Sequence, residues 1–172
     1  MLLANQEHRP AFAELTTRHT RWLLGLTSKL SGSTLDAEAI VQEVWLSVWN
    51  HRARYRPEGR FRAYLLVLVR NGVRNQARSR ARRPTVAEEL DTFGSDPKQL
   101  ERLLDQEREH RLLEALQRLE PRMREALVLR YAEELAYDEM SRMLDTKPAT
   151  LRARVHGALV LLRRHFTERP DK

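Results

Sequence analysis

The segment RFRAYLLVLVRNGVRNQARSRARR, residues 60–83, places an apolar helical face next to a dense run of arginines. Its apolar residues recur at steps of three and four, the spacing of one face of an α-helix. They are Phe61, Tyr64, Leu65, Leu68, Val69 and Val73. Arg70, Arg74 and Arg78 are four residues apart and therefore share a second face. The segment predicts a long helix with one buried face and one basic face.

No acidic residue lies between Gly59 and Ala87, so no nearby carboxylate offsets the repulsion among the stacked arginines. Such a surface, with Asn71 and Asn75 beside it, is suited to lie along a phosphate backbone. The alternative is a charged face that contacts only solvent. The absence of local acids favours a polyanionic partner.

Composition narrows the class of protein. The chain has 172 residues and a formal net charge of +7, which favours nucleic acid first and an anionic membrane surface second. It contains no cysteine, so neither a disulfide framework nor a thiolate metal site is expected. No apolar run approaches the ~20 residues needed to span a bilayer. We expect a cytoplasmic protein without membrane insertion.

Apolar spacing and helix-breaking residues predict an all-α protein of two small helical domains. In the first domain we expect helices at residues 10–30 and from Asp36 to about residue 49, with the Asp36 carboxylate as the helix cap. Residues 84–97, PTVAEELDTFGSDP, contain four acidic residues and no basic one, which is typical of a linker. The predicted organisation is a domain at 1–83, an acidic linker at 84–97 and a domain at 98–172.

In the second domain, helices are expected from Pro97 to residue 120, from Pro121, at 137–144 and from Pro148 to about residue 166. The last two, joined by a three-residue turn, are typical of a helix-turn-helix, although helical hairpins without a DNA function share this spacing. Four residues form the buried line of the last helix: Leu151, Val155, Ala158 and Leu162. The candidate groove contacts point away from that line: Thr150, Arg152, Arg154 and His156.

Three further groups of residues each allow two interpretations. Acidic and amide side chains begin the second helix, where they either complement the helix dipole or form a docking surface: Asp36, Glu38, Gln42 and Glu43. Tyr55 and Phe61, interleaved with arginines, either stack on exposed bases or belong to the core. Val160 and Leu161 lie off the buried line and are either partner-binding or part of a wider core contact.

The sequence contains no nucleophile elbow, no P-loop, no zincin motif and no paired acid–base constellation. Its six histidines are scattered. We therefore expect no catalytic residues, no metal, no cofactor and no small-molecule substrate.

Three segments resemble the extracytoplasmic-function (ECF) sigma factors of bacterial RNA polymerase. DAEAIVQEVWLSVW at 36–49 is similar to their second conserved region, and FRAYLLVLVRNGVRNQARSRARR at 61–83 is similar to the helix that follows. LEPRMREALVLRYAEELAYDEMSRMLDTKPATLRARVHGAL at 119–159 resembles their fourth region. The resemblance covers roughly residues 11–166 and implies a subunit that binds core RNA polymerase, directs it to promoter DNA and is held inactive by an anti-sigma factor.

The resemblance also implies roles for individual residues. Core polymerase would be bound by Asp36, Glu38, Val41, Gln42, Glu43 and Trp45. The minus-ten promoter element would be opened and read by Tyr55, Arg56, Arg60, Phe61, Arg62, Arg70, Asn71, Arg74, Asn75 and Arg78. The minus-thirty-five element would be read by Lys147, Thr150, Arg152, Arg154 and His156.

This chain departs from the family pattern at several positions. Ala136 stands where a Ser or Thr usually caps the helix, at an expected cost of ~1 kcal/mol. Asp145 occupies a turn position that is usually Gly, where we expect a left-handed backbone. Ala39 replaces a common acid, and Gly157 and Leu159 replace frequent arginines.

Three other classes of protein remain as alternatives. One is a helix-turn-helix regulator that acts on duplex DNA without being a polymerase subunit, against which the motif at 36–49 argues. Another is a sigma-like decoy fused to a phosphoacceptor domain, for which 172 residues leave no room. The third is an all-α enzyme, which no catalytic motif in the sequence supports.

Overall fold

The computed structural model describes residues 9–56, 61–82 and 97–168, and it describes side chains for 9–56, 61–80 and 107–167. The helices are α1 (Arg9–Ser31), α2 (Thr34–Asn50), the short 3-10 helix η2 (Arg52–Arg54), α3 (Phe61–Arg82), α4 (Pro97–Gln117), α5 (Pro121–Tyr131), α6 (Tyr137–Leu144) and α7 (Pro148–Glu168). No strand occurs in the described ranges, which confirms the all-α prediction. Apart from Pro97, the predicted linker lies outside the described residues.

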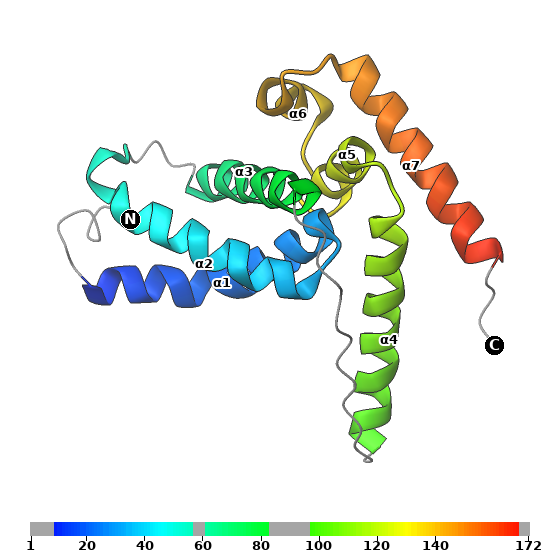
Figure 1. Cartoon of the computed structure of the whole chain (residues 1–172), viewed down its shortest axis with the longest axis horizontal. Helices are drawn as coiled ribbons and strands as arrows, with labels where there is room; N and C mark the ends of the chain where they lie inside the picture. The colour runs from blue at the N-terminus through cyan, green and yellow to red at the C-terminus, as the bar shows by residue number, and fades with distance from the viewer. Residues whose placement is uncertain (1–8, 57–60, 83–96, 169–172) are drawn as a thin grey trace.

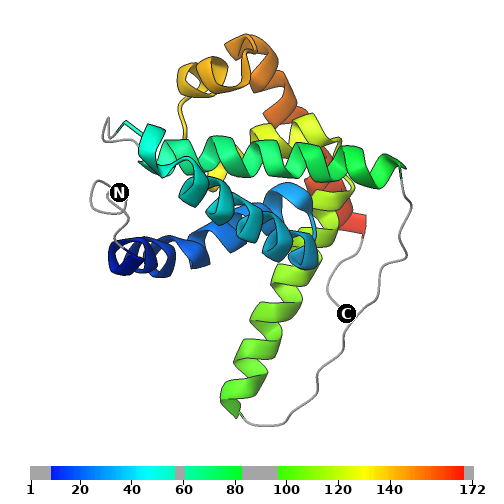
Figure 2. The ribbon, with the colours of Figure 1, turned by 60° about the vertical axis from the view of Figure 1, so that its left-hand side comes forward.

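The helices form two groups that touch each other (Figure 1). Helices α1, α2 and α3 pack against one another, while α5, α6 and α7 form the second group with α4. The groups meet where α1 contacts α4 and α5, and Figure 2 shows α3 running along the same side as α5. One continuous apolar cluster crosses the boundary and includes Leu23, Leu26, Val48, Leu65, Val69, Leu116, Leu129, Leu151 and Val155. None of the described helices meets the length and apolarity that a bilayer crossing requires.

The junction between α1 and α2 is short and is stabilised by local hydrogen bonds. Gly32 adopts a left-handed backbone with φ of 76°, and its N–H donates to the Ser28 carbonyl at 2.7 Å. The Ser33 hydroxyl then accepts the Asp36 N–H at 3.3 Å and caps α2. The prediction that α2 begins at a capping Asp36 is therefore wrong. The helix begins at Thr34 because Ser33 supplies the cap, and the Asp36 carboxylate points elsewhere.

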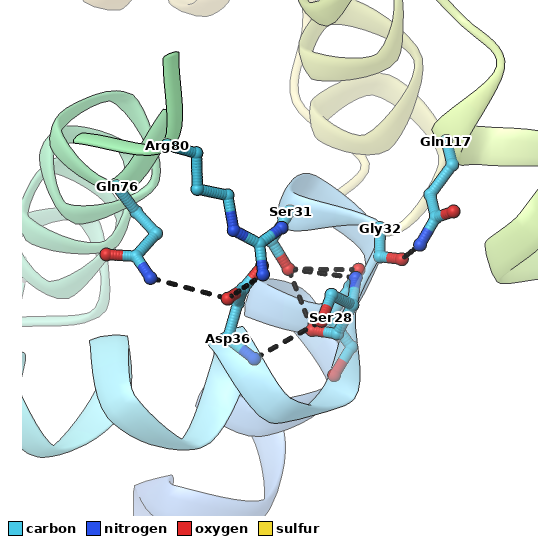
Figure 3. Close-up of polar contacts among 8 residues, drawn as sticks. Ser28, Ser31, Gly32, Asp36, Gln76, Arg80 and Gln117 are labelled. Atoms are coloured by element: carbon cyan, nitrogen blue, oxygen red, sulfur yellow. Dashed lines mark hydrogen bonds and ion pairs between the residues drawn. The ribbon is translucent and has the colours of Figure 1, made fainter. Parts of the chain in front are cut away.

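The Asp36 carboxylate links the start of α2 to the end of α3 (Figure 3). It is 6% exposed and forms an ion pair with Arg80, and Gln76 donates a second hydrogen bond to it at 3.3 Å. In the same corner, the side-chain amide of Gln117 on α4 donates to the Gly32 carbonyl. A buried carboxylate needs such partners because its desolvation is otherwise costly. This cluster therefore holds α3 alongside α2.

Helices α2 and α3 approach closely at a glycine. A Cβ added to Gly72 would lie 2.7 Å from Cγ2 of Ile40, which is itself 1% exposed. The missing side chain therefore lets α3 pack against α2 along its apolar face.

The helix-turn-helix prediction for the second domain is confirmed. A turn separates α6 from α7, and within it Asp145 adopts the expected left-handed backbone with φ of 48°. Ala136 precedes α6 as its N-cap and offers no side-chain acceptor, as its identity predicted. The Glu139 carboxylate still accepts the Ala136 N–H at 2.9 Å, so half of a capping box is present.

Two glycines on neighbouring helices should respond oppositely to the same substitution. Gly72→Ala should destabilise the protein by about 1–3 kcal/mol, because its methyl group overpacks against buried Ile40. Gly25→Ala in α1 meets nothing within 4 Å and should stabilise by ~0.5–1 kcal/mol through helix propensity. Urea unfolding of both variants measures the difference, and equal effects would contradict a close approach of α2 and α3.

Removal of the Asp36 charge should cost stability. We expect Asp36→Asn to lower the free energy of unfolding by about 1–3 kcal/mol, because Arg80 loses its buried charged partner. The matched control Glu38→Gln changes an exposed acid on the same helix and should stay within about 0.5 kcal/mol of the parent. If the two variants unfold at the same urea concentration, the Asp36 cluster does not hold α2 and α3 together.

Candidate nucleic-acid interface

The residues predicted to bind polymerase divide between the surface and the interior of α2. Glu38, Gln42 and Glu43 are exposed and share the outer face of the helix. Asp36 and Val41 are buried, at 6% and 3% exposure. Trp45 is half-buried, with its indole N–H donating to the Thr20 hydroxyl at 3.1 Å. The three interior side chains therefore set the position of α2, while the outer three present an acidic and amide surface.

Sequence reasoning missed two exposed leucines on this helix. Leu35 is 59% exposed and Leu46 is 63% exposed, although leucines usually contribute to a core. The signal was available, because both fall outside the stripe of Ala37, Ile40, Val44 and Val48 that α2 buries. The surface of α2 thus combines apolar and acidic side chains, a composition suited to a protein partner.

Aromatic and basic side chains surround an open pocket of about 670 Å³ between the end of α2, η2 and α3. The Tyr55 ring lies 5.1 Å from the Tyr64 ring and 5.7 Å from the Phe61 ring, measured between centroids. Of the predicted residues, Tyr55 and Arg56 line the pocket. The lining residues that sequence reasoning missed include His51, Arg54 and Tyr64. Partial burial raises the pKa of Tyr64, so its hydroxyl stays protonated.

The arginine face of α3 is not free of acids, which corrects the expectation from the sequence. Glu125 on α5 accepts hydrogen bonds from Nε of Arg70 at 2.7 Å and from Arg74 at 3.2 Å. Arg62 pairs with Glu133, in the loop after α5, at 3.1 Å. Local sequence shows no acid because these carboxylates come from the second domain.

The other predicted residues of this face lie at its edges. Asn71, Asn75 and Arg78 are exposed on α3, and Arg60 lies outside the described residues. His19 on α1 lies beside the face, with its ring 5.5 Å from that of Phe61. Burial and the charges of Arg18 and Arg62 lower the pKa of His19, so the imidazole is neutral at neutral pH.

The predicted groove residues lie off the buried line of α7 or in the turn before it. Leu151, Val155 and Ala158 are buried, at no more than 2% exposure, as the spacing predicted, whereas Leu162 at the end of the predicted line is only partly buried. Off this line, Thr150, Arg152 and His156 are exposed and Arg154 is half-buried, while Lys147 is exposed in the turn before α7. The Arg152 guanidinium lies 5.1 Å from the centre of the Tyr137 ring, and that of Arg130 lies 5.3 Å from it. Tyr137, which sequence reasoning did not single out, therefore restrains Arg152.

Apolar side chains are exposed further along α7. Val160 is 53% exposed and Leu161 is 46% exposed, which confirms that they lie off the buried line. Leu159 and Phe166, at 39% and 45%, extend the surface. In the part of the chain that is described, no three His, Asp or Glu side chains are grouped as metal ligands would be.

Comparison with known proteins identifies the family to which each part of the chain is similar. Residues 15–83 match the Sigma-70 region 2 family, and residues 109–162 match the Sigma-70 region 4 family. The chain is 29% identical to the ECF RNA polymerase sigma factor SigE of Mycolicibacterium smegmatis, over 95% of this chain and 65% of that protein.

Two solved structures share the fold. The structure of CnrH in complex with the cytosolic domain of CnrY superposes with a TM-score of 0.69, at 19% identity, over 97% of this chain and 94% of that one. The sigma factor RpoE of Bartonella quintana, in complex with the anti-sigma factor NepR, gives a TM-score of 0.68 at 21% identity, over 94% of this chain and 99% of that one.

The likeness in sequence extends over nearly the whole chain. The RNA polymerase sigma factor CarQ of Myxococcus xanthus is 30% identical over 161 residues, which span 89% of this chain and 87% of that protein. Because identity at this level spans both domains of the fold, the chain belongs to the ECF family of RNA polymerase sigma factors, which direct promoter recognition.

Proposed function

We propose that this sigma factor docks on core polymerase through the outer face of α2 and holds promoter DNA on the remaining surfaces of its two domains. The domains are residues 1–83 and 98–172, joined by the acidic linker at 84–97. The protein acts in the cytoplasm as a non-catalytic subunit. One observation supports this most: the first domain separates an acidic–apolar face on α2 from a basic–aromatic face on α3.

Docking uses Glu38, Gln42 and Glu43, together with exposed Leu35 and Leu46. Exposed acids facing a basic surface mainly speed association and fix register, while apolar side chains contribute burial. Asp36, Val41 and Trp45 contribute by holding α2 in place rather than by contact.

The basic–aromatic face reads the minus-ten element as a single strand. Tyr55 and Arg56 line a pocket large enough for an unpaired base, and the Phe61 ring contacts Tyr55 beside it. Base stacking on an aromatic ring is worth roughly 1–3 kcal/mol. Arg60, Arg62, Arg70, Arg74 and Arg78, with Asn71 and Asn75, hold the backbone next to it.

The minus-thirty-five element is read in the major groove by α7. Lys147, Thr150 and His156 are exposed and lie off the buried line, and Arg154 is half-buried. Arg152 is the residue that we assign to a guanine edge, because its stacking on Tyr137 limits the loss of side-chain entropy on binding.

An anti-sigma factor binds the exposed apolar surface of α7. Of the two solved structures that share this fold, one holds a sigma factor in complex with an anti-sigma factor, and the other holds CnrH in complex with the cytosolic domain of CnrY. The residues Leu159–Leu161 form an apolar surface on this chain that neither the core nor the groove side uses.

The test of docking is transcription by core polymerase on a genomic promoter library, with and without this chain. We expect Glu38→Lys combined with Glu43→Lys to lower core affinity by at least about tenfold, which is ~1.4 kcal/mol. The charge-matched control is Glu109→Lys with Glu120→Lys, on exposed acids of the second domain. Unchanged affinity of the first double variant would remove the docking assignment.

The same library tests the DNA contacts. Arg152→Ala should relax the preference at one upstream base pair, whereas a uniform loss across all sequences would assign Arg152 to phosphate. Duplex binding without any dependence on core polymerase would instead favour a helix-turn-helix regulator.

The inhibitor prediction uses the exposed pair Val160 and Leu161. Val160→Ser with Leu161→Gln should preserve the circular dichroism spectrum, because both side chains are exposed. The variant should transcribe in the presence of the anti-sigma factor, once that protein has been identified by pull-down with the parent chain. The control is Tyr131→Gln, which changes a different exposed apolar side chain of the same domain, and this variant should still be inhibited by the anti-sigma factor. Equal inhibition of the α7 variant and the parent would contradict this site.

A further inference from the structure

We propose that Glu125 and Glu133 of the second domain form an internal surface that competes with promoter DNA for the arginine face of α3. The protein then has a closed form, in which these carboxylates occupy the arginines, and an open form, in which DNA does. This inference rests on the proposed function, because it takes Arg62, Arg70 and Arg74 as contacts of the minus-ten strand.

The strongest contacts of this surface are made by Glu125 on α5. One carboxylate oxygen accepts from Nε of Arg70 at 2.7 Å, and the other accepts from Arg74 at 3.2 Å. Arg70 also donates to the Met143 carbonyl, at the end of α6, at 3.3 Å. The side chains of Arg70 and Glu125 are only 15% and 13% exposed. In the closed form Arg70 is therefore unavailable to a phosphate.

Glu133 makes a second contact at the other end of the interface. One of its oxygens accepts from Arg62 at 3.1 Å, and the other accepts the indole N–H of Trp22 on α1 at 2.9 Å. The Glu133 side chain is 4% exposed, so these bonds form where water is largely excluded. The Arg62 guanidinium also stacks on the Trp22 ring, 4.3 Å from its centre. Two carboxylates thus engage three arginines that the sequence places with no local acid.

Carboxylate and phosphate oxygens are interchangeable partners for a guanidinium, because both accept its N–H groups in a planar fork. A given arginine cannot satisfy both at once. The acids of the second domain therefore stand where the DNA backbone would lie, and binding of one must release the other.

The closed interface also has features that allow it to open. Arg124 is packed against Gly32, where an added Cβ would lie 2.7 Å from its NH1 atom. Among the described residues, no acceptor reaches the buried Nε of Arg124, and burial lowers the pKa of its guanidinium. An open pocket of about 900 Å³ remains between α3 and the α5–α6 region beside Glu133. Opening would hydrate Arg124, which offsets part of the cost of exposing the apolar contacts of α1.

The consequence is a lower affinity of the free chain for DNA. When only a fraction of molecules is competent, the apparent dissociation constant rises in inverse proportion to that fraction. A chain that is closed most of the time would therefore bind promoter DNA less tightly than its open form. The two glutamates thus lower the affinity of the free chain for DNA.

The experiment measures domain separation and DNA affinity on the same full-length chain. The sequence has no cysteine, so Ala13→Cys on α1 and Ala149→Cys on α7 allow a donor and an acceptor dye to be attached at exposed positions. A short single-stranded oligonucleotide of mixed sequence is the DNA probe, followed by fluorescence anisotropy at low salt. The test variant is Glu125→Gln with Glu133→Gln, and the control is Glu109→Gln with Glu120→Gln, which changes net charge equally at exposed sites.

We expect the test variant to lose energy transfer and to bind the oligonucleotide about tenfold more tightly than the parent, because more molecules are open. The control should keep the parent's energy transfer and gain less affinity. Saturating oligonucleotide should lower the transfer of the parent itself.

Three results would overturn the inference. Unchanged energy transfer in the test variant would show that the two glutamates do not hold the domains together, whatever the affinity for the oligonucleotide. Equal gains in affinity for test and control would mean that only net charge matters. Loss of transfer with no gain in affinity would remove the competition and, separately, the assignment of these arginines to DNA in the proposed function.

Discussion

The burial of Leu65 and Val69 determines how α3 is rotated, and the remaining surfaces depend on that rotation. Both side chains are 0% exposed, and Gly72 lets their helix approach Ile40 closely. With that face against α1 and α2, the arginines four residues apart must point toward α5 or into solvent. The pocket beside Tyr55 and the contacts to Glu125 follow from the same rotation.

Carboxylates in this protein act in different ways according to their burial. Asp36 belongs by position to an acidic run on α2, yet its side chain is buried and holds α3 through Arg80. Glu38 and Glu43, on the same helix, remain exposed. A family motif identifies all three as one group, whereas burial separates a residue that stabilises the domain from residues that can meet a partner.

The second domain has a comparable division along α7. Its inner side packs through Leu151 and Val155, its groove side presents Arg152, and its later turns expose Val160 and Leu161. Because α7 has three surfaces, DNA, the hydrophobic core and an inhibitor can each contact different residues of it. Because α5 packs against both α7 and α1, it connects the helix that carries these surfaces to the first domain.

Much of the fold was predictable from local physics. Apolar spacing located the helices, and Asp145 and Ala136 predicted the geometry of the turn and the weak cap before α6. The start of α2 was predicted wrongly, because Ser33 and Asp36 are both residue types that cap helices well. In the structure Ser33 is the cap, and the Asp36 carboxylate forms an ion pair with Arg80 instead. Exposed Leu35 and Leu46 could have been found from the helical phase of their neighbours.

The sequence by itself determined that the chain is helical, that it has two domains, and which family it resembles, because these depend on spacing between near neighbours. Only the tertiary structure decided which charges meet. Glu125 lies 55 residues from Arg70, and Glu133 lies 71 residues from Arg62 and 111 from Trp22. Such pairs depend on how the two domains dock, and no local pattern of charge or periodicity contains that information.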